Sequence, residues 1–430
     1  MLQLYLLTFN CARELVDPQS LAPSFFDALP KAAPLPDVVA ISLQEIAPIA
    51  YSFLGGSYLK PYLDRLTTTV QLAADLHSHG SEQLQHVATR SLGMTGLMIF
   101  AKPKFVERIQ WIQSAGAGVG LWNMGNKGAI AMRIGVACAG YDDTLDLSFA
   151  AAHLAPSENN VDARNKDWEN LVRNLVFVSG DESSYSSSER GRMLPPSTES
   201  PKGQSGLFTA GNHVFFYGDL NYRTHDTGPD PETHKTFPQP SMPESSPKHF
   251  SRLLERDQLT REKEANRTLH GLEELPIYFP PTYKYAMPDD KTANGLQRSL
   301  AEAEEEWKWS KHRYPSWCDR ILFLPSHPSA KLEPQVYTSL PVQPTSDHRP
   351  VALSLRVDDR PVPRDTTDVR SSPPYPLNPR WESRQAAGRQ CEVIVGVLSY
   401  LALTKKGNAA LLAVIAMIMG SLWLAASFRT

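Results

Sequence analysis

The sequence has little that would support a disulfide framework, a zinc site or a nucleic-acid-binding surface. Its four cysteines, Cys11, Cys138, Cys318 and Cys391, are far apart and form no Cys-x-x-Cys pair, which argues against both bound zinc and disulfides. The net charge of −3 provides no overall basic field for nucleic acid or an anionic membrane. These absences favour a reducing, cytosolic setting with no nucleic-acid partner, so any attraction to an anion must be local.

The N-terminus also lacks the basic region that opens a signal peptide. Residues 2–9 are predicted to form a strand that enters the fold directly, and we expect no secretory signal. The 430 residues would suffice for two or three average domains. Regular strand and helix signals over roughly 350 residues nevertheless favour one large domain with an appendage.

The appendage ends in a long apolar run. Residues 409–428 carry no charge, and as a helix they would span about 30 Å, the thickness of one hydrocarbon core. Lys405 and Lys406 flank the run, and positive flanks stay in the cytosol. We expect a tail anchor with the whole folded domain in the cytosol, and modest hydrophobicity favours the endoplasmic reticulum membrane. The alternative is a buried core helix. A shorter apolar run, 393–403, is predicted to lie in the membrane interface rather than to span.

Three segments have few large apolar residues. The Ser-rich stretch 181–206 and the Pro-rich stretch 227–247 are predicted to be mobile surface insertions. The stretch 358–408 is predicted to be a linker and juxtamembrane segment, because its first part is rich in Pro and Arg. The main domain is therefore expected to cover residues 1–357.

The most informative motif runs from Phe216 to Arg223. An apolar strand is predicted over 214–217, and Asp219 and Asn221 follow it two residues apart. Side chains two apart in an extended segment point the same way, so a carboxylate and a carboxamide face one spot. Such a pair can hold and deprotonate a water molecule. The same pattern is also ordinary turn chemistry.

Polar residues stand at the ends of several other apolar strands. They are Asn10 after 2–9, Glu45 after 38–43, His153 after 145–152, Asp319 before 321–324, and Asp347 with His348 before 351–355. If the strands that follow their polar residues run antiparallel to those that precede them, all of these groups meet at one edge. The pattern predicts a single active site at the rim of a β-sandwich.

A second set of residues suits an anionic substrate. Tyr283 and Lys284 offer a phenol beside an ammonium, and Lys311 and Arg313 offer two cations shortly before Asp319. The alternative for each is a solvated loop. Asn126 and Lys127 follow a glycine-rich loop, 115–125, and could place another cation at the rim. That loop lacks the Walker spacing, so it does not favour nucleotide binding.

Three motifs together resemble the inositol polyphosphate 5-phosphatases. They are Phe216–Arg223, Pro315–Leu322 with its Trp-Cys-Asp-Arg order, and Ser346–Val351. The similarity covers about residues 1–357, with Phe at position 216 where that family often has Trp. It implies an α/β fold, the four-layered sandwich of the metal-dependent endonuclease/exonuclease/phosphatase (DNase I-like) type. With its C-terminal transmembrane helix, the chain resembles a tail-anchored, fungal-type member.

The resemblance also implies roles for the site residues. Mg²⁺ would be the cofactor, with Glu45 as the principal ligand and Asn10 and Asp347 beside it. Asp219 would orient and deprotonate the attacking water, and Asn221 would hold the water or a phosphoryl oxygen. The remaining catalytic residues would contact the phosphate directly or through a partner; they are His348, paired with Asp319, and His153.

The implied substrate is phosphatidylinositol 4,5-bisphosphate, which would lose its 5-phosphate. Residues resembling the contacts of that family to the 4-phosphate are Tyr283, Lys284, Lys311 and Arg313. Two rival functions stay open: a phosphodiesterase of the same fold, acting on nucleic acid or sphingomyelin, and a non-catalytic phosphoinositide-binding membrane tether. The sequence does not identify any protein partner.

Overall fold

The fold is built on two β-sheets packed face to face. In the computed structural model, which describes residues 1–179, 205–287, 304–364 and 368–428, each sheet contains six strands. In the order in which they pair, the strands of the first sheet are β11 (Leu332–Ser339), β12 (Val351–Val357), β1 (Leu2–Asn10), β2 (Val38–Gln44), β4 (Thr95–Ala101) and β3 (Gln85–Leu92). Those of the second are β10 (Asp319–Phe323), β9 (Asn212–Asp219), β7 (Thr144–His153), β6 (Gly128–Ala137), β5 (Ile109–Gly118) and β8 (Val178–Ser179).

The main core fills the space between the sheets. Leu4 and Ile99 from the first sheet and Phe149 and Phe215 from the second belong to one buried cluster. The rings of Phe149 and Phe215 are stacked with centroids 5.4 Å apart. Strands buried on both faces read as continuous apolar runs, which is why the central strands were recognisable in the sequence.

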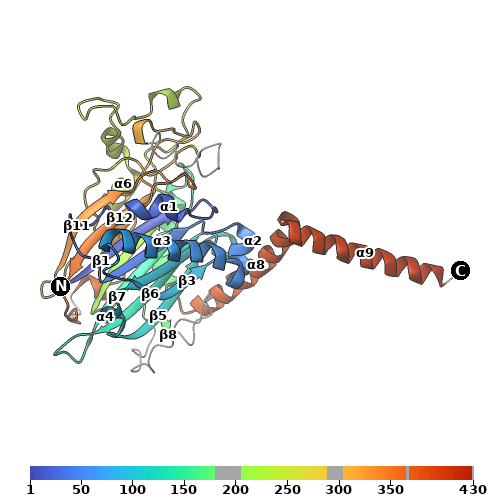
Figure 1. The fold of residues 1–430 in the computed structure, drawn as a ribbon, viewed down its shortest axis with the longest axis horizontal. Coiled ribbons are helices and arrows are strands. Elements are labelled where there is room, and N and C mark those ends of the chain that lie inside the picture. Colours follow the sequence, from blue (N-terminus) through green and yellow to red (C-terminus); the bar gives the residue numbers. More distant parts are fainter. Residues whose placement is uncertain (180–204, 288–303, 365–367, 429–430) are drawn as a thin grey trace.

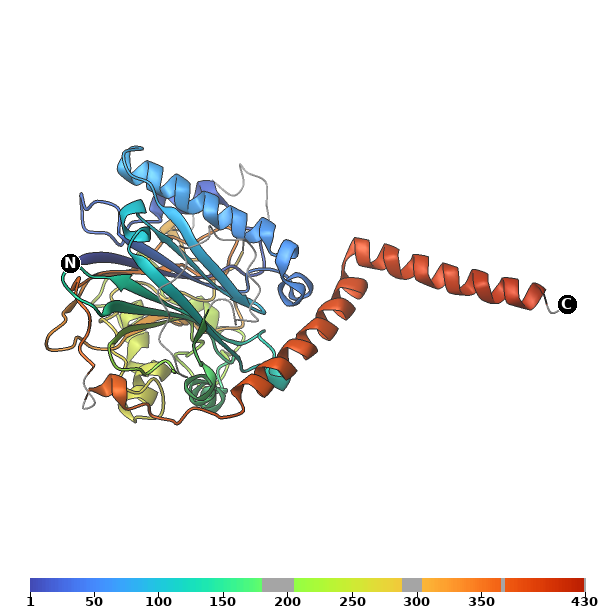
Figure 2. The ribbon, with the colours of Figure 1, turned by 90° about the horizontal axis from the view of Figure 1, so that it is seen from below.

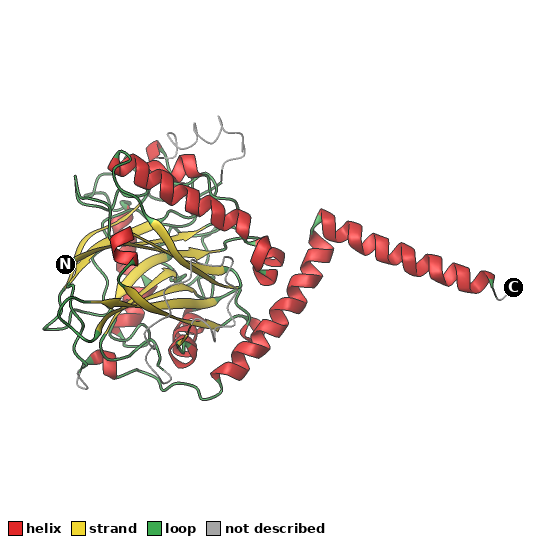
Figure 3. Cartoon of the chain, turned by 60° about the horizontal axis from the view of Figure 1, so that its bottom comes forward, coloured by secondary structure: helices red, strands yellow, loops and turns green. Residues whose placement is uncertain are grey.

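Helices cover the outer face of each sheet. Helix α3 (Lys60–Ser78) packs on the first sheet through apolar residues at helical spacing, including Leu63, Leu66 and Val70. Helix α5 (Val161–Asn174) packs on the second sheet through Trp168 and Leu171. Figure 3 shows these helices on either side of the paired sheets. The four-layered α/β sandwich is confirmed.

The relative directions of the strands agree with the prediction that polar strand ends meet. β1 pairs parallel with β2, and β7 pairs parallel with β9. β12 runs antiparallel to β1, and β10 runs antiparallel to β9. The C-terminal ends of β1, β2, β7 and β9 therefore lie at the same edge as the N-terminal ends of β10 and β12.

Shorter helices connect the strands. In the described residues they include α1 (Pro18–Leu21), α2 (Ile49–Leu54), α4 (Pro103–Val106), α6 (Gln258–Glu264) and the 3₁₀ segments η3 (Leu121–Asn123) and η5 (Phe250–Arg256). The glycine-rich stretch 115–125 was predicted to be a loop, but its first residues extend β5 to Gly118. Gly116 and Gly118 pair there with Ile130 and Gly128 of β6, so the loop itself is 119–127.

Two long helices end the chain. Helix α8 (Trp381–Leu403) runs along one end of the domain, and α9 (Lys405–Ser427) projects away from it (Figures 1 and 2). By length and composition both could cross a membrane. The predicted linker 358–408 thus differs from the structure, since α8 packs against α2 and η3. The run 393–403, predicted to be too short to span, is the second half of this longer helix.

The two predicted insertions have different outcomes. Most of 181–206 lies outside the described residues. The stretch 227–247 has a defined path, because Phe237 is buried and the Pro238 carbonyl accepts a hydrogen bond from Trp309 at 2.7 Å. Gln239 and Trp307 exchange two further bonds of 2.9 and 3.0 Å. Proline-rich composition therefore did not distinguish a packed loop from a mobile one.

Candidate active site

A pocket of about 290 Å³ opens where the polar strand ends meet. Strand register explains the convergence: His153 of β7 lies opposite Asp219 of β9, which lies opposite Asp319 of β10. Asn10 ends β1 in the other sheet, and its Nδ2 donates to Asp219 Oδ2 at 2.9 Å. Residues separated by more than two hundred positions thus form one site across the seam between the sheets.

Asp219 is the buried centre of the pocket. Only 2% of it is exposed, and the backbone N–H of Asn221 donates to its Oδ1 at 3.1 Å. Burial raises the pKa of Asp219, but His153, together with the charges of His348 and Lys127, outweighs burial and holds the pKa well below its usual range. Asp219 is therefore ionised at neutral pH and can accept a hydrogen bond from a ligand.

Lys127 and His153 lie beside this carboxylate. His153 Nε2 is 2.6 Å from Lys127 Nζ and 3.3 Å from Asp219 Oδ2. Burial and the neighbouring Lys127 lower the pKa of His153, and burial lowers the pKa of Lys127. His153 Nε2 thus lies between an ammonium and a carboxylate, and the three side chains form one polar cluster in which Lys127 lies near the Asp219 carboxylate.

His348 and Asp319 form a buried pair on the other side. His348 Nδ1 is 2.8 Å from Asp319 Oδ2, which also accepts from Thr282 Oγ1 at 2.6 Å. Burial lowers the pKa of His348, but the carboxylates of Asp319, Asp219 and Asp347 raise it to about 9. His348 therefore presents an imidazolium to the pocket, with its orientation fixed by Asp319.

Two site residues have left-handed backbone conformations. The φ angles of Glu45 and Asn221 are +46° and +58°. Such conformations are uncommon for residues other than glycine and occur often at functional sites. Each turns the chain sharply at the end of its strand, which directs the following side chains along the rim.

Three oxygen-bearing side chains predicted as metal ligands line the same pocket: Glu45, Asn10 and Asp347. Glu45 Oε2 lies 2.9 Å from Arg13 Nε, and Asp347 Oδ2 pairs with Lys284 Nζ. Among the residues that the structure describes, no three His, Cys, Asp or Glu side chains form a metal site by themselves. Two carboxylates with one carboxamide nevertheless suit Mg²⁺, which keeps several waters and takes one or two carboxylates.

The predicted substrate-binding residues divide into two groups. Tyr283, Lys284 and Lys127 line the pocket. Lys311 is exposed and outside that lining, and Arg313 Nη1 is 3.3 Å from Glu158 Oε2. Asn126 also lies outside the pocket lining, and its buried Oδ1 has no hydrogen-bond partner.

Two cations of the pocket were not assigned a role from the sequence. Arg223 is 2% exposed, its guanidinium lies 4.2 Å above the Tyr283 ring, and its buried Nη1 has no partner. Arg13, paired with Glu45, lies at the mouth. Arg223 is the last residue of the motif 216–223, and this position could have indicated it.

The residues around Asp319 in the order Trp-Cys-Asp-Arg have a mainly structural role. Trp317 and Cys318 are fully buried. Arg320 forms a buried ion pair with Asp257 at 3.0 Å and a second with Glu274 at 2.7 Å. Removing one partner of such a pair typically costs about 3–5 kcal/mol, so these contacts fix the strand that presents Asp319.

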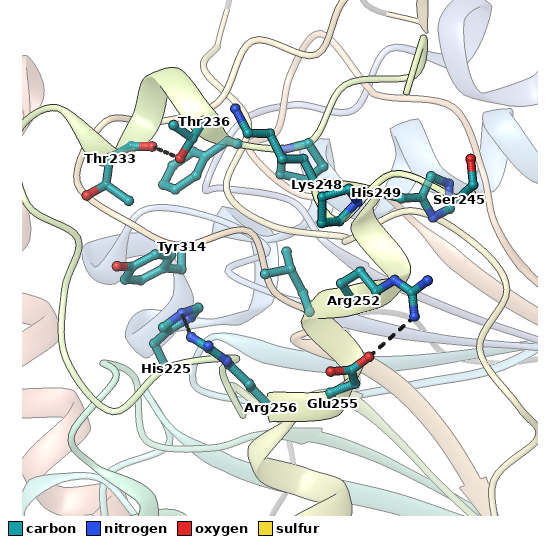
Figure 4. A pocket seen from close by; sticks show the side chains of 14 residues that line it. His225, Thr233, Thr236, Ser245, Lys248, His249, Arg252, Glu255, Arg256 and Tyr314 are labelled. Carbon is teal, nitrogen blue, oxygen red and sulfur yellow. Dashed lines mark hydrogen bonds and ion pairs between the residues drawn. The ribbon is translucent and has the colours of Figure 1, made fainter. Parts of the chain in front are cut away.

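A larger cavity, of about 660 Å³, lies among the loops beside η5 (Figure 4). Its charged groups face one another: Arg252 Nη1 is 3.6 Å from Glu255 Oε1, and Arg256 Nη1 donates to His225 Nε2 at 3.2 Å. His225 stacks on Tyr314 with ring centroids 3.5 Å apart. We assign the chemistry to the smaller pocket, because buried carboxylates and imidazoles converge only there among these two cavities.

Comparison with known proteins agrees with the geometry. The model of endonuclease/exonuclease/phosphatase family 2 matches residues 7–354. The chain is 27% identical over 341 residues to inositol-1,4,5-trisphosphate 5-phosphatase 1 of Schizosaccharomyces pombe, covering 79% of this chain and 26% of that protein. It is 29% identical over 267 residues to phosphatidylinositol 3,4,5-trisphosphate 5-phosphatase 1 of Homo sapiens, covering 62% and 19%.

A solved structure also shares the fold. The inositol polyphosphate 5-phosphatase domain of Spsynaptojanin, crystallised with inositol (1,4)-bisphosphate and calcium, superposes with a TM-score of 0.57 at 24% identity and covers 92% of each chain. The present chain spans about a quarter or less of the length of the two curated relatives. It belongs to the endonuclease/exonuclease/phosphatase family, and its predicted resemblance to the inositol polyphosphate 5-phosphatases is confirmed.

Proposed function

We propose that the protein is a Mg²⁺-dependent phosphatase that removes the 5-phosphate of phosphatidylinositol 4,5-bisphosphate at the cytosolic face of a membrane. The observation that carries the proposal is the convergence of Asp219, His348 and Glu45 in one pocket. The names of the relatives support a 5-phosphatase. The inositol (1,4)-bisphosphate in the related crystal structure has a 4-phosphate but no 5-phosphate, as the product of the proposed reaction would.

The pocket residues divide the hydrolysis between them. Asp219, ionised and held by Asn10, orients the attacking water and takes its proton as the new P–O bond forms and the bond from phosphorus to the ring oxygen at position 5 breaks. The ring oxygen takes a proton from solvent and leaves as an alcohol. His348 as imidazolium, with Lys127 and Arg223, balances the negative charge of the phosphoryl group in the transition state. The proposed phosphate therefore lies between Asp219 and these cations, with no covalent enzyme intermediate.

Glu45, Asn10 and Asp347 would hold the Mg²⁺. When bound, the ion supplies positive charge that offsets charge developing on the phosphoryl and leaving oxygens. Arg13 is paired with Glu45, and this pairing keeps the carboxylate at the pocket mouth. The 4-phosphate would contact Lys284 and Tyr283, whose ring lies 4.6 Å from that of His348.

The decisive experiment measures inorganic phosphate released from vesicles containing a single phosphoinositide. We expect phosphate from phosphatidylinositol 4,5-bisphosphate, little from the 4-phosphate, and slower release from the 5-phosphate, which lacks the group bound by Lys284. EDTA should abolish release and excess Mg²⁺ should restore it, because the transition-state charge then loses and regains its counter-ion. Equal release from the 4-phosphate would contradict 5-phosphate specificity, and unchanged turnover in EDTA would contradict the metal.

Membrane attachment through α9 explains a lipid substrate without an overall basic surface. Both flanking lysines, Lys405 and Lys406, would stay in the cytosol, as in a tail-anchored protein of the endoplasmic reticulum. Attachment raises the effective concentration of enzyme at the bilayer. Helix α8 carries Arg389 and a buried Glu392 and packs on the domain, so α9 is the span in this proposal.

Deletion of residues 409–428 should separate attachment from turnover. The shortened protein is expected to leave the membrane fraction, while its kcat/KM for a short-chain, soluble form of the lipid stays within about twofold of the parent value. Fractionation and phosphate release measure the two effects. A deleted protein that still sediments with membranes would contradict the anchor.

A phosphodiesterase of the same fold is the second candidate. The pocket offers it the same acids and imidazoles, but Lys284 and Tyr283 line a place for a further phosphate that a diester substrate lacks. A diesterase would release no inorganic phosphate, so the vesicle experiment distinguishes the two. A binding protein without activity would release none from any lipid.

A further inference from the structure

Helix α8 is docked on the domain rather than suspended from it. Its buried residues, Trp381, Gly388, Glu392 and Gly396, face the protein. A Cβ at Gly388 would lie 2.4 Å from the Asn123 carbonyl oxygen, and one at Gly396 would lie 3.0 Å from Phe53 Cβ. Only glycine permits so close an approach, so α8 is fitted to α2 and to the loop 119–127.

Glu392 bonds this helix to the loop. Its side chain is 1% exposed, and its Oε1 accepts the backbone N–H of Gly125 at 2.7 Å. Its Oε2 accepts from Arg389 Nη1 at 2.9 Å, and the same Nη1 donates to the Phe53 carbonyl at 2.7 Å. A buried carboxylate needs such partners, and charge-assisted bonds of this kind are roughly twice as strong as neutral ones.

The loop that Glu392 holds also carries an active-site cation. Gly125 is fixed at both backbone groups, because its carbonyl accepts from the Met94 N–H at 3.0 Å. Two residues later, Lys127 reaches His153 at 2.6 Å and lies 4.0 Å from Glu45. The backbone of Lys127 is tied back in turn to Val119 at 2.9 Å. The path from α8 to the pocket is therefore short and hydrogen-bonded.

We propose that Glu392 is a positioning residue for the phosphatase reaction, acting from the membrane-proximal helix through Gly125 to place Lys127 in the pocket. The expected effect of Glu392 on turnover rests on the proposed function. Glu392 lies outside residues 7–354, which the family model matches, so this part of the site is supplied by the tail of the chain.

The test uses the full-length protein with substitutions at Glu392. Glu392→Ala removes the acceptor of the Gly125 N–H, whereas Glu392→Gln keeps an acceptor of the same length. We expect Glu392→Ala to lower kcat/KM for the short-chain lipid by roughly tenfold, and Glu392→Gln to retain most of it. The control is Glu382→Gln, which makes the same charge change on the exposed first turn of α8.

Two readouts distinguish positioning from a general loss of structure. Amide hydrogen exchange in 119–127 should become roughly tenfold faster in Glu392→Ala than in the control, while exchange in the sheets is unchanged. In a Lys127→Ala background, Glu392→Ala should cause no further loss of kcat/KM, because the two act through one contact. If Glu392→Ala fails to fold, Glu392→Asp, one methylene shorter, takes its place with the same expectations.

The outcomes separate the two proposals. A parent protein that releases no phosphate contradicts the proposed function, yet the exchange comparison still decides whether Glu392 holds the loop. An active parent in which Glu392→Ala changes neither exchange in 119–127 nor turnover overturns the positioning. A loss of turnover that adds fully to that of Lys127→Ala also overturns it.

Discussion

Replacement of Asp219 with Asn is expected to lower phosphate release from phosphatidylinositol 4,5-bisphosphate by about 10³-fold or more. The substitution keeps an oxygen that can accept from Asn10 Nδ2, but it removes the negative charge that orients water and receives its proton, an effect typically worth about 10²–10⁴-fold. Initial rates at saturating Mg²⁺ measure it. The main change should be in kcat, because the carboxylate acts on the water rather than on the lipid.

The matched control for that result is Asp64→Asn, which removes a half-exposed carboxylate paired with Lys60 at 2.8 Å. Exposed pairs contribute little to stability, so the control should keep its activity and its melting temperature. If Asp219→Asn retained a rate within tenfold of the parent, the proposed role in water activation would be untenable.

Replacement of His348 with Asn is expected to lower kcat/KM by about 10²–10³-fold. The imidazolium is fixed by Asp319 at 2.8 Å and faces the pocket, and loss of one such donor to a developing oxyanion has an effect of this size. His79→Asn, at an exposed position remote in sequence from the motifs, provides the control. Calorimetric unfolding of both variants would show whether the loss is catalytic or structural.

The substitution Asp319→Asn distinguishes the contribution of Asp319 to activity from that of His348. The amide still occupies the place beside Thr282, but it no longer favours the charged imidazole. A loss smaller than that of His348→Asn is expected, because Asp319 acts through His348. An equal or larger loss in Asp319→Asn would assign the main role to the carboxylate instead.

The meeting of the site residues at one edge could be predicted from the side of each apolar run on which its polar residue lies. Asp219 and Asn221 follow an apolar run, whereas Asp319 precedes one, and these groups could meet only if the two kinds of strand ran in opposite directions. Parallel and antiparallel pairing then left only one edge for all of them. The four-layered architecture followed from the family resemblance rather than from these patterns.

The rest depended on contacts that no local pattern encodes. Lys311 and Arg313 are close to Asp319 in sequence, but the loop before β10 turns Arg313 toward Glu158. Glu392 directly precedes the apolar run 393–403 in the sequence, and only the close packing around Gly388 and Gly125 makes it a buried acceptor. Contacts between segments that are far apart in the sequence produce no periodic pattern in it, so they cannot be predicted from periodicity.

The junction between the last two helices sets where the enzyme can act. Helix α8 ends at Leu403 and α9 begins at Lys405, so a single residue, Thr404, joins the docked helix to the proposed span. Its Oγ1 accepts the Gly407 N–H at 2.9 Å, which stiffens the corner. If α9 spans a membrane as proposed, so short a hinge would hold the pocket at a set height above the leaflet. Hydrolysis would then favour lipids of the membrane that holds the helix over those of an apposed bilayer.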